Sequence, residues 1–469
     1  MSEQIAPATL EQYAAQGHAQ LAARAAQLQR VRQRKFDTLA VHGLYGAEAA
    51  LANAGSINEP IILSSAQHFE NSDHMEATIT GQVPGWAYTR IANPTIGYLE
   101  ETLALLEGYG YAGEVSALAT ASGMAAIFMA TNPFLSLDLN RSSNGTLLAA
   151  RPNIVATPRC YGGTFHLFTE RYAQERGIEV RWVSDPDSLE AWAACIDANT
   201  RFLYGEMPSN PTLDVLDLAA LAELAHTYYL PLIVDSTVAT PALLRPLCHG
   251  ADIVVHSVSK SMTISGMAIA GAVIARHNLP SRVGPDALRE NFIQYIKYLP
   301  FRDYGPALSP FSAMLIMNDL RSLRSRMDSL SCNAMQVAQF LAQHPAIEHV
   351  YYPGIASHAG HALAQHYLLL ADSSDNDGAP VNRYGHLLSF SLRGGMPAAR
   401  AVLDRFGLIW RATDLGRIKS IATIPAISTH QQQGEDGRKM AGIPAGMIRL
   451  NVGGEHPADV IADLDQALG

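Results

Sequence analysis

Short apolar segments that alternate with helical stretches constrain the fold of this chain more than any other feature. The segments are NIVAT from residue 153, RFLY from 201, LIVD from 232 and DIVV from 252. Between the second and the third, Asp217 can cap a helix that Pro231 ends. This alternation predicts βαβ crossovers. Because the segments are apolar on both faces, we expect a parallel sheet covered by helices, with ligands at the carboxyl ends of its strands.

The regions on either side of this block show different patterns. Residues 1 to about 35 are rich in Ala, Gln and Arg, and they predict an exposed helical arm. After about residue 296, helices are followed by two alternating segments, which predict a smaller α+β domain. These segments are LLSFSLR (387–393) and MIRLNV (447–452), and the polar stretch at 372–380 predicts a surface loop before them. We therefore expect three parts, at 1–84, 85–295 and 296–469.

Composition and charge exclude several classes of protein. Hydrophobic residues make up 48% of the 469 residues and charged residues 16%, which is typical of a compact globular chain. The formal net charge of −10 disfavours nucleic acid and anionic membranes as partners. The sequence contains no run of about 20 uncharged apolar residues, the length that is needed to span a bilayer. Small molecules are therefore the expected partners. The widely spread cysteines favour neither a zinc site nor disulfides, which fits a cytoplasmic protein. These cysteines are Cys160, Cys195, Cys248 and Cys332.

Two of the predicted strands end in residues that could carry chemistry. DIVVHSVSK delivers Ser257, Ser259 and Lys260 to a turn. Lys260 is either a solvated surface lysine or a lysine that bonds a cofactor aldehyde, with hydroxyls nearby to hold a phosphate. PLIVDST places Asp235 at a strand end. There it is either a helix cap or a carboxylate that faces a cation such as a pyridinium nitrogen.

Seven motifs in a fixed order connect the chain to a known family. They are FDTLAVHG (36–43), YTRIANPT (88–95), ASGMAA (121–126), YGGTF (161–165), EMPSNP (206–211), HSVSK (256–260) and GIPAGMIRLNVGGE (442–455). Together they resemble the cystathionine γ-synthase-like, or Cys/Met metabolism, family of pyridoxal-phosphate enzymes. The resemblance implies the α/β fold type I of PLP-dependent transferases. That fold has a large domain with a mostly parallel sheet flanked by helices, and a smaller C-terminal α+β domain.

The resemblance implies pyridoxal 5'-phosphate as cofactor and assigns residues to its ring. Lys260 matches the lysine that forms the internal aldimine, and Asp235 matches the acid that keeps the pyridine nitrogen protonated. Tyr161 matches the aromatic residue that stacks on the ring, where a phenol can also move a proton. Asn210 matches an asparagine near the ring hydroxyl, although an Asn before Pro can also simply shape a turn.

The resemblance places the cofactor phosphate at the start of a predicted helix. Ser122, Gly123 and Met124 precede that helix, so their backbone amides could receive the phosphate dianion, helped by the helix dipole. Ser257 and Ser259 would add hydroxyl donors. The alternative for the Ser-Gly-Met segment is an ordinary helix start with a serine cap.

Further matched residues concern the substrate and a neighbouring subunit. In the family, residues matching Tyr88 and Arg90 reach the phosphate of the neighbour, with Tyr88 also at the substrate. Active sites would then be shared in a homo-oligomer, at least a dimer and in full a homotetramer, with residues 1–84 contacting the neighbour. Arg449 matches the arginine that forks onto the substrate α-carboxylate. Ser420 aligns with a serine beside the same carboxylate.

The histidines of SHAGHALAQH do not predict a metal site. The spacings of His358, His361 and His366 match no standard zinc motif, and no acid or cysteine completes a ligand set nearby. We therefore expect no bound metal.

A few positions bear on the reaction. Methionine γ-lyases typically carry a cysteine where this chain has Gly163. The SLGG-x-ES segment of cystathionine synthases and lyases, whose acid binds a distal amine, is replaced by SIATIPAISTH (420–430), which has no acid. That stretch resembles the HPASTTH pattern of O-acetylhomoserine sulfhydrylases, as DYGPALSPF (303–311) also does. Ile424 and Ile427 depart from the pattern, as does SKSMTISGMAIAG after the lysine.

These comparisons predict a γ-replacement. The substrate would be an O-acylhomoserine such as O-acetylhomoserine, and sulfide or a small thiol would give homocysteine or methionine. In the family, the substrate amine displaces the lysine matched by Lys260, and the freed amine removes the Cα proton. The alternatives are a γ-lyase that yields a 2-oxo acid and ammonia, or a cystathionine γ-synthase. A protein that binds the cofactor without turnover is disfavoured by the intact set of Lys260, Asp235 and Arg449.

Overall fold

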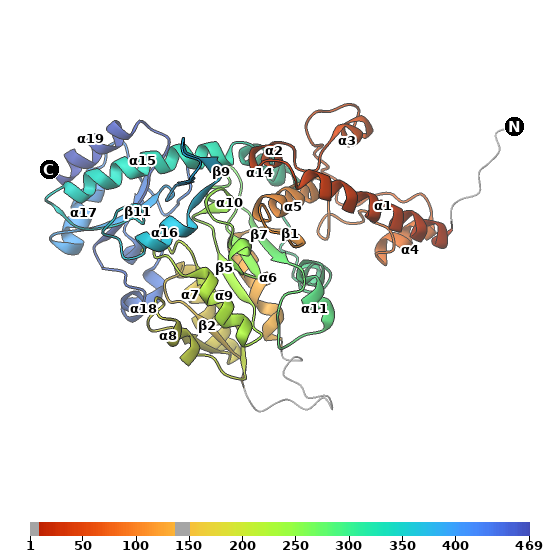
Figure 1. Ribbon diagram of the computed structural model, residues 1–469, viewed down its shortest axis with the longest axis horizontal. Helices are drawn as coiled ribbons and strands as arrows, with labels where there is room; N and C mark the ends of the chain where they lie inside the picture. Colours follow the sequence, from red (N-terminus) through yellow and green to blue (C-terminus); the bar gives the residue numbers. More distant parts are fainter. Residues whose placement is uncertain (1–8, 137–150) are drawn as a thin grey trace.

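The computed structural model describes residues 9–136 and 151–469, and these form an arm and two domains. Figure 1 shows the arm, with α1 (Leu10–Val31), projecting from one end of the body. The C-terminal helices α15 (Leu323–Gln343), α17 (Gly395–Arg405) and α19 (Pro457–Leu468) lie at the other end. Within the described ranges, no helix combines the length and apolar character that crossing a bilayer requires.

A seven-stranded sheet forms the centre of the large domain. Its order is β1-β7-β6-β5-β4-β2-β3. Neighbours from β6 to β3 pair in parallel, while β7 runs antiparallel to both β1 and β6. The prediction of a mostly parallel sheet is therefore confirmed. The strands are β1 (Val115–Thr120), β2 (Asn153–Ala156), β3 (Glu179–Trp182), β4 (Thr200–Glu206), β5 (Leu232–Asp235), β6 (Ile253–His256) and β7 (Gly271–Arg276).

Helices cover both faces of this sheet, which explains why its central strands are apolar throughout. On one face Val234 packs in a core with Leu103 and Leu221, and on the other Ile233 packs in a core with Phe165 and Phe292. Asp217 caps α9 as predicted, since its side chain accepts a hydrogen bond from the Ala220 N–H. The helices are α5 (Pro94–Glu107), α6 (Gly123–Thr131), α7 (Gly162–His166), α8 (Leu189–Ala194), α9 (Leu218–Thr227), α10 (Thr240–Leu243), α11 (Asp286–Glu290) and α12 (Phe292–Ile296).

The C-terminal domain contains a five-stranded sheet in the order β12-β13-β14-β11-β8. Leu388 and Phe390 of β11 point into the core under the helices, whereas Ser389 points to the large domain and donates to the Pro211 carbonyl. The predicted alternation is therefore present, but its polar face is buried against the large domain. The strands are β8 (Ile347–Tyr351), β11 (Leu387–Leu392), β12 (Trp410–Arg411), β13 (Ile421–Thr423) and β14 (Met447–Asn451).

The hydrophobic core of the large domain continues beyond residue 296. Ile316 of α14 and Leu323 and Met327 at the start of α15 belong to it, whereas Ala334 and Leu341 farther along α15 belong to the C-terminal core. One helix thus enters both cores. The remaining helices of this half are α13 (Arg302–Tyr304), α14 (Pro310–Leu320), α16 (His361–Tyr367) and α18 (Gly434–Met440).

The polar stretch at 372–380 is not simply a loop. Its first residues complete β9 (Leu369–Ser374) and its last begins β10 (Pro380–Asn382), and the two strands pair antiparallel. The turn between them is closed by Asp375, whose carboxylate accepts from the N–H groups of Asp377 and Ala379. The composition predicted the exposed turn but missed the hairpin around it.

The N-terminal arm is helical, as predicted. A capping box between Thr9 and Gln12 starts α1. Tyr13 packs with Ala77 and Val83 in a small core of its own, and its hydroxyl donates to Glu70 at 2.7 Å. The other helices of the arm are α3 (Ala47–Ala52) and α4 (Ser72–Ile79), whereas α2 (Phe36–His42) packs with Phe36 and Leu39 into the core of the large domain.

Candidate active site

A cavity of about 740 Å³ lies at the carboxyl ends of β4, β5 and β6, where the C-terminal domain meets the large domain. All predicted site residues line it except Tyr88, Arg90 and Ser420. Those that do are Ser122, Gly123, Met124, Tyr161, Asn210, Asp235, Ser257, Ser259, Lys260 and Arg449. The sheet edge and the C-terminal domain therefore bring together residues that are more than 300 positions apart in the chain.

One end of the cavity is suited to an anion. Ser122 caps α6 by accepting from the Ala125 N–H at 3.1 Å. The N–H groups of Gly123 and Met124 have no hydrogen-bond partner among the described residues. A Cβ at Gly123 would lie 2.6 Å from Cβ of Ser257, so only glycine lets the two segments approach this closely. Unpaired amides at a helix start, with the Ser257 hydroxyl beside them, can hold a phosphate dianion.

Ser259 already uses its hydroxyl within the protein. Its Oγ donates to the Ala270 carbonyl and accepts from the Ala270 N–H, both at 2.9 Å. It therefore ties the turn that carries Lys260 to the residue before β7. Ser257 is also held through its backbone, since its N–H donates to Thr237 Oγ1 at 2.7 Å.

Two buried acids lie side by side at the strand ends. Asp235 of β5 is the register partner of Glu206 of β4, and their exposed fractions are 6% and 4%. Burial raises the pKa of both carboxyls, and the charge of Asp235 raises that of Glu206 further. Neither lysine nor arginine pairs with Asp235 in the described part of the chain. A cationic ring nitrogen facing Asp235 would offset the cost of this buried charge.

Glu206 organises the residues around the predicted ring site. Its Oε2 accepts from the Tyr161 N–H at 2.7 Å, and its Oε1 accepts from the Asn210 N–H at 2.8 Å. The Tyr161 ring meets the His430 ring edge-on, with centroids 6.4 Å apart. Burial lowers the pKa of His430 to about 3, so its neutral ring donates from Nε2 to the Asn210 carbonyl at 3.0 Å. Tyr161 is thus held by Glu206 of β4 through its backbone and by His430 through its ring.

Arg449 is a buried cation without an acidic partner among the described side chains. It is 2% exposed, and burial lowers its pKa to about 10. Its guanidinium donates to Asn210 Oδ1 at 3.0 Å and to the carbonyl of Asp414 at 3.0 Å. Asn210, which was expected near the ring hydroxyl, therefore contacts the arginine with its side-chain oxygen. A buried guanidinium at a cavity wall suits a small carboxylate.

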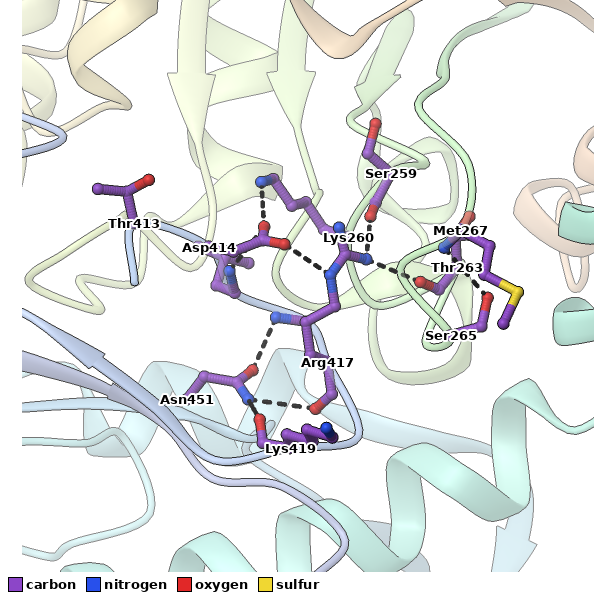
Figure 2. A network of polar contacts seen from close by, with 12 residues as sticks. Ser259, Lys260, Thr263, Ser265, Met267, Thr413, Asp414, Arg417, Lys419 and Asn451 are labelled. Carbon is purple, nitrogen blue, oxygen red and sulfur yellow. Dashed lines mark hydrogen bonds and ion pairs between the residues drawn. The ribbon is translucent and has the colours of Figure 1, made fainter. Parts of the chain in front are cut away.

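Lys260 is paired with an acid that the sequence analysis did not single out. Its Nζ donates to Asp414 Oδ1 at 2.6 Å, and the second oxygen of Asp414 accepts from Arg417 Nε at 2.6 Å (Figure 2). Asp414 and Arg417 come from a loop of the C-terminal domain, in the segment ATDLGR. An acid and a base three residues apart around a glycine were a visible signal, but nothing in their spacing connected them to the lysine. Glu206, at the start of EMPSNP, was likewise overlooked.

The remaining predicted residues lie elsewhere in this chain. Ser420 is buried, donates to Glu455 Oε2 at 2.9 Å and accepts from the Gly453 N–H at 2.9 Å. Tyr88 and Arg90 line a separate groove of about 410 Å³ next to Ser64 and Ser65. The Arg90 guanidinium lies 5.5 Å from the centre of the Tyr88 ring and also contacts the Arg302 carbonyl.

The histidines considered as metal ligands serve other purposes. His361 donates from Nδ1 to the Pro353 carbonyl at 2.7 Å, and His358 accepts from the Gly360 N–H at 3.1 Å. In the ranges 9–136 and 151–469, no three His, Cys, Asp or Glu side chains are grouped so that they could hold a metal ion.

Solved structures define the class to which this fold and site belong. A crystal structure from Campylobacter jejuni, described as an O-acetylhomoserine (thiol)-lyase with a pyridoxyl-lysine group, matches with a TM-score of 0.80 at 34% identity. The match covers 93% of this chain and all of that one. Cystathionine γ-synthase of Xanthomonas oryzae matches with a TM-score of 0.77 at 30% identity, covering 93% and 98% of the two chains. The protein is a fold type I, PLP-dependent enzyme, as predicted.

Sequence comparison identifies the family within this class. The family model for the Cys/Met metabolism PLP-dependent enzymes matches residues 37–469, and the chain belongs to this family. An L-methionine γ-lyase of Fusobacterium nucleatum is 36% identical over 416 residues, covering 88% of this chain and 94% of the relative. An O-acetyl-L-homoserine sulfhydrylase of Leptospira meyeri is 33% identical over 460 residues, covering 92% and 96%. Lyases and sulfhydrylases are thus about equally similar.

The cavity fits pyridoxal phosphate by the chemistry of its donors. Among the described residues, the start of α6 offers amides without a hydrogen-bond partner for a dianion, and Asp235 offers a buried carboxylate that no lysine or arginine pairs with. Lys260 lines the same cavity with a partly exposed side chain. These three features could receive the phosphate, the ring nitrogen and the aldehyde of the cofactor.

Proposed function

We propose that the protein catalyses γ-replacement on an O-acylhomoserine, with O-acetylhomoserine as the substrate. Sulfide would give homocysteine and acetate, and methanethiol would give methionine and acetate. A PLP-dependent reaction of Cys/Met metabolism follows from the family to which the chain belongs. The choice of γ-replacement rests on the residues that face the substrate.

In the described part of the chain, no carboxylate that lines the cavity is available for the amine of a second amino acid, and this observation carries the proposal. Among the described lining residues, the carboxylates are those of Glu206, Asp235 and Asp414. Glu206 accepts from two backbone amides, Asp235 lies at the ring site, and Asp414 pairs with Lys260 and Arg417. A nucleophile without an amine, such as sulfide or a small thiol, fits this set better than cysteine does.

Gly163 supports replacement over methionine cleavage. A Cβ at this position would lie 2.5 Å from Cε1 of Tyr161, so the tyrosine ring occupies the space that a cysteine would need. The position of Tyr161 therefore depends on this glycine. Of the two departures from the sulfhydrylase pattern, Ile427 lines the cavity, whereas Ile424 is buried in the C-terminal core.

The chain's own residues have separate tasks in this proposal. When bound, pyridoxal phosphate withdraws electrons from Cα of the substrate. Lys260 would hold the cofactor covalently, and its Nζ would accept the Cα proton of the substrate. Asp235 would keep a proton on the ring nitrogen, and Tyr161 would stack on the ring. Arg449 binds the α-carboxylate and so orients Cα toward Lys260.

A γ-lyase is the second candidate, because a methionine γ-lyase is 36% identical to this chain. An assay of O-acetylhomoserine with and without sulfide separates the two. Replacement predicts homocysteine and acetate in the presence of sulfide, with little 2-oxobutanoate in its absence. Rapid formation of 2-oxobutanoate and ammonia without sulfide, unchanged when sulfide is added, would refute the proposal and establish the lyase.

We further propose that the protein is a homotetramer whose smallest active unit is a dimer, with active sites shared between subunits. Tyr88 and Arg90 lie in their own groove rather than in the cavity of the same chain, which is compatible with a role toward a neighbour. Mixing inactive Arg90→Ala and Lys260→Ala chains should restore activity, because one site of each hybrid dimer would carry neither change. If verified heterodimers stay inactive, each chain supplies its own Arg90.

A further inference from the structure

The loop that carries Asp414 is fastened to the turn that carries Lys260. Gly416 approaches this turn so closely that a Cβ would lie 2.3 Å from the Ser261 nitrogen, and its φ of +74° suits glycine. On the other side, the Gly416 N–H donates to Asn451 Oδ1 at 2.7 Å. The amide of Asn451 donates in turn to the carbonyls of Arg417 and Lys419 at 3.2 and 2.9 Å. The loop is thus held from both domains.

Arg417 fixes the direction of the Asp414 carboxylate. Figure 2 shows its guanidinium between Asp414 and the lysine turn. Nε donates to Asp414 Oδ2 at 2.6 Å, and Nη1 donates to the Thr263 carbonyl at 2.8 Å and also to the Ser259 carbonyl. The other oxygen of Asp414, Oδ1, accepts from Lys260 Nζ and from the N–H of Leu415. These contacts hold the Asp414 carboxylate in one orientation, with Oδ1 toward Lys260.

The pair faces the cavity rather than the solvent-exposed exterior alone. The side chains of Lys260 and Asp414 are 28% and 31% exposed, and both line the cavity. Burial by itself would raise the pKa of Asp414, but the hydrogen bond and charge of Lys260 and the charge of Arg417 hold it below its usual value. The carboxylate is therefore charged at neutral pH.

We propose that Asp414 is a positioning residue for Lys260, holding its ammonium group at the cavity wall whenever the lysine is not bonded to the cofactor. When the bond forms, the same carboxylate lies beside the linking nitrogen and favours its protonated form. This inference rests on the assignment of Lys260 as the cofactor lysine in the proposed function. Besides Asp235, which is assigned to the ring nitrogen, the site would then contain a second acid, Asp414 from the C-terminal domain, which favours the charged form of Lys260.

The charges around the pair define the expected effect. Arg417 faces it from the same loop and Arg449 from β14, while Asp235, Glu206 and the Tyr161 phenol face the cavity from the strand ends and α7. Of the three acids that line the cavity, Asp414 is the one that contacts Lys260 in the described structure. An opposite charge at this range typically shifts a pKa by about one to three units, so Asp414 should raise that of the linkage.

Titration of the holoenzyme without substrate tests the proposal. The visible absorbance of the cofactor reports protonation of the linking nitrogen as pH is varied. Asp414→Asn should lower the midpoint by about one unit or more. Arg417→Gln removes a positive charge and should raise the midpoint or leave it in place. Asp319→Asn is the matched control, because Asp319 holds the same segment through Ser265 without contacting Lys260, and its midpoint should equal that of the wild type.

The outcomes separate charge from structure. An unchanged midpoint in Asp414→Asn overturns the inference. A downward shift shared by Asp414→Asn, Arg417→Gln and Asp319→Asn also overturns it, since a displaced loop rather than a lost charge would then explain the result. Reduction of the wild-type holoenzyme with borohydride and peptide mapping tests the underlying assignment separately. Cofactor on another lysine refutes the proposed function, whereas cofactor on Lys260 with an unmoved midpoint refutes only the role of Asp414.

Discussion

The two walls of the cavity are built in different ways. On the large-domain wall, Asp235 and Glu206 end neighbouring strands, and Gly123 starts a helix, so the backbone of the sheet fixes where they lie. On the C-terminal wall, Asp414 lies in a loop whose position depends on side chains such as Asn451. The motifs shared with the family lie mainly on the first wall. The positions of the residues proposed for the cofactor thus follow from the sheet, whereas the position of the acid paired with Lys260 depends on a loop.

Removing Lys260 should produce the largest effect. Lys260→Ala removes both the covalent partner of the cofactor and the group that moves the Cα proton, so turnover should fall by about a thousandfold or more. Absorbance after dialysis and a homocysteine assay measure the two losses. Lys419→Ala is the control, because Lys419 lies in the C-terminal domain over the Trp410 ring and does not line the cavity, so this variant should keep colour and turnover. A yellow, active Lys260→Ala enzyme would contradict the assignment of the first wall.

The acids of the two walls should differ in their contribution to rate. Asp235→Asn cannot hold a proton on the ring nitrogen, so kcat should fall by about a hundredfold while the cofactor stays bound through its phosphate. Asp414→Asn should lower kcat by about tenfold or less, because it acts through Lys260. Single-turnover measurement of Cα deprotonation checks both. Equal losses would mean that the two walls do not divide cofactor and lysine control as described.

Arg449 should affect substrate binding more than cofactor binding. Arg449→Lys should raise KM for O-acetylhomoserine by about tenfold, because a charge-assisted hydrogen-bonded pair is worth about 1.5 to 3 kcal/mol and lysine lacks the planar fork. The cofactor absorbance should not change. Arg438→Lys provides a comparison, since Arg438 donates only to backbone carbonyls of His430 and Gln431 among the described contacts. Unaltered KM in Arg449→Lys would move the carboxylate site elsewhere.

The smallest predicted effect is on the acid stability of the cofactor-free protein. The pKa of Asp414 is lowered from its usual 3.8, so the Lys260 pair stabilises the fold above that pH and is lost as pH falls through the lowered value. Asp414→Asn should lower Tm by about 1 to 2 °C at pH 7 and by less near pH 3, since a partly exposed pair contributes modestly. A Tm difference that grows toward low pH would contradict this sign.

The sequence predicted the large-domain wall because strand ends meet at one edge of a parallel sheet. LIVD and DIVV are apolar on both faces, which indicated a parallel sheet with Asp235 and Lys260 near its carboxyl edge, and the order of the motifs connected the two residues to one site. The loop of the C-terminal wall that carries Asp414 and Arg417 offered no comparable periodicity. Ser420 was expected beside the substrate, yet its hydroxyl bonds Glu455, and the acid that reaches Lys260 is Asp414. Which loop residue faces a cavity depends on tertiary contacts that no local pattern reports.

Helix α15 has a consequence for how the molecule opens. Met327 near its start lies in the core of the large domain, and Leu341 near its end lies in the core of the C-terminal domain. A continuous helix transmits displacement along its axis, so one core cannot melt without disturbing the helix that completes the other. We therefore expect the amides in the middle of α15 to exchange hydrogen only through unfolding of both domains together.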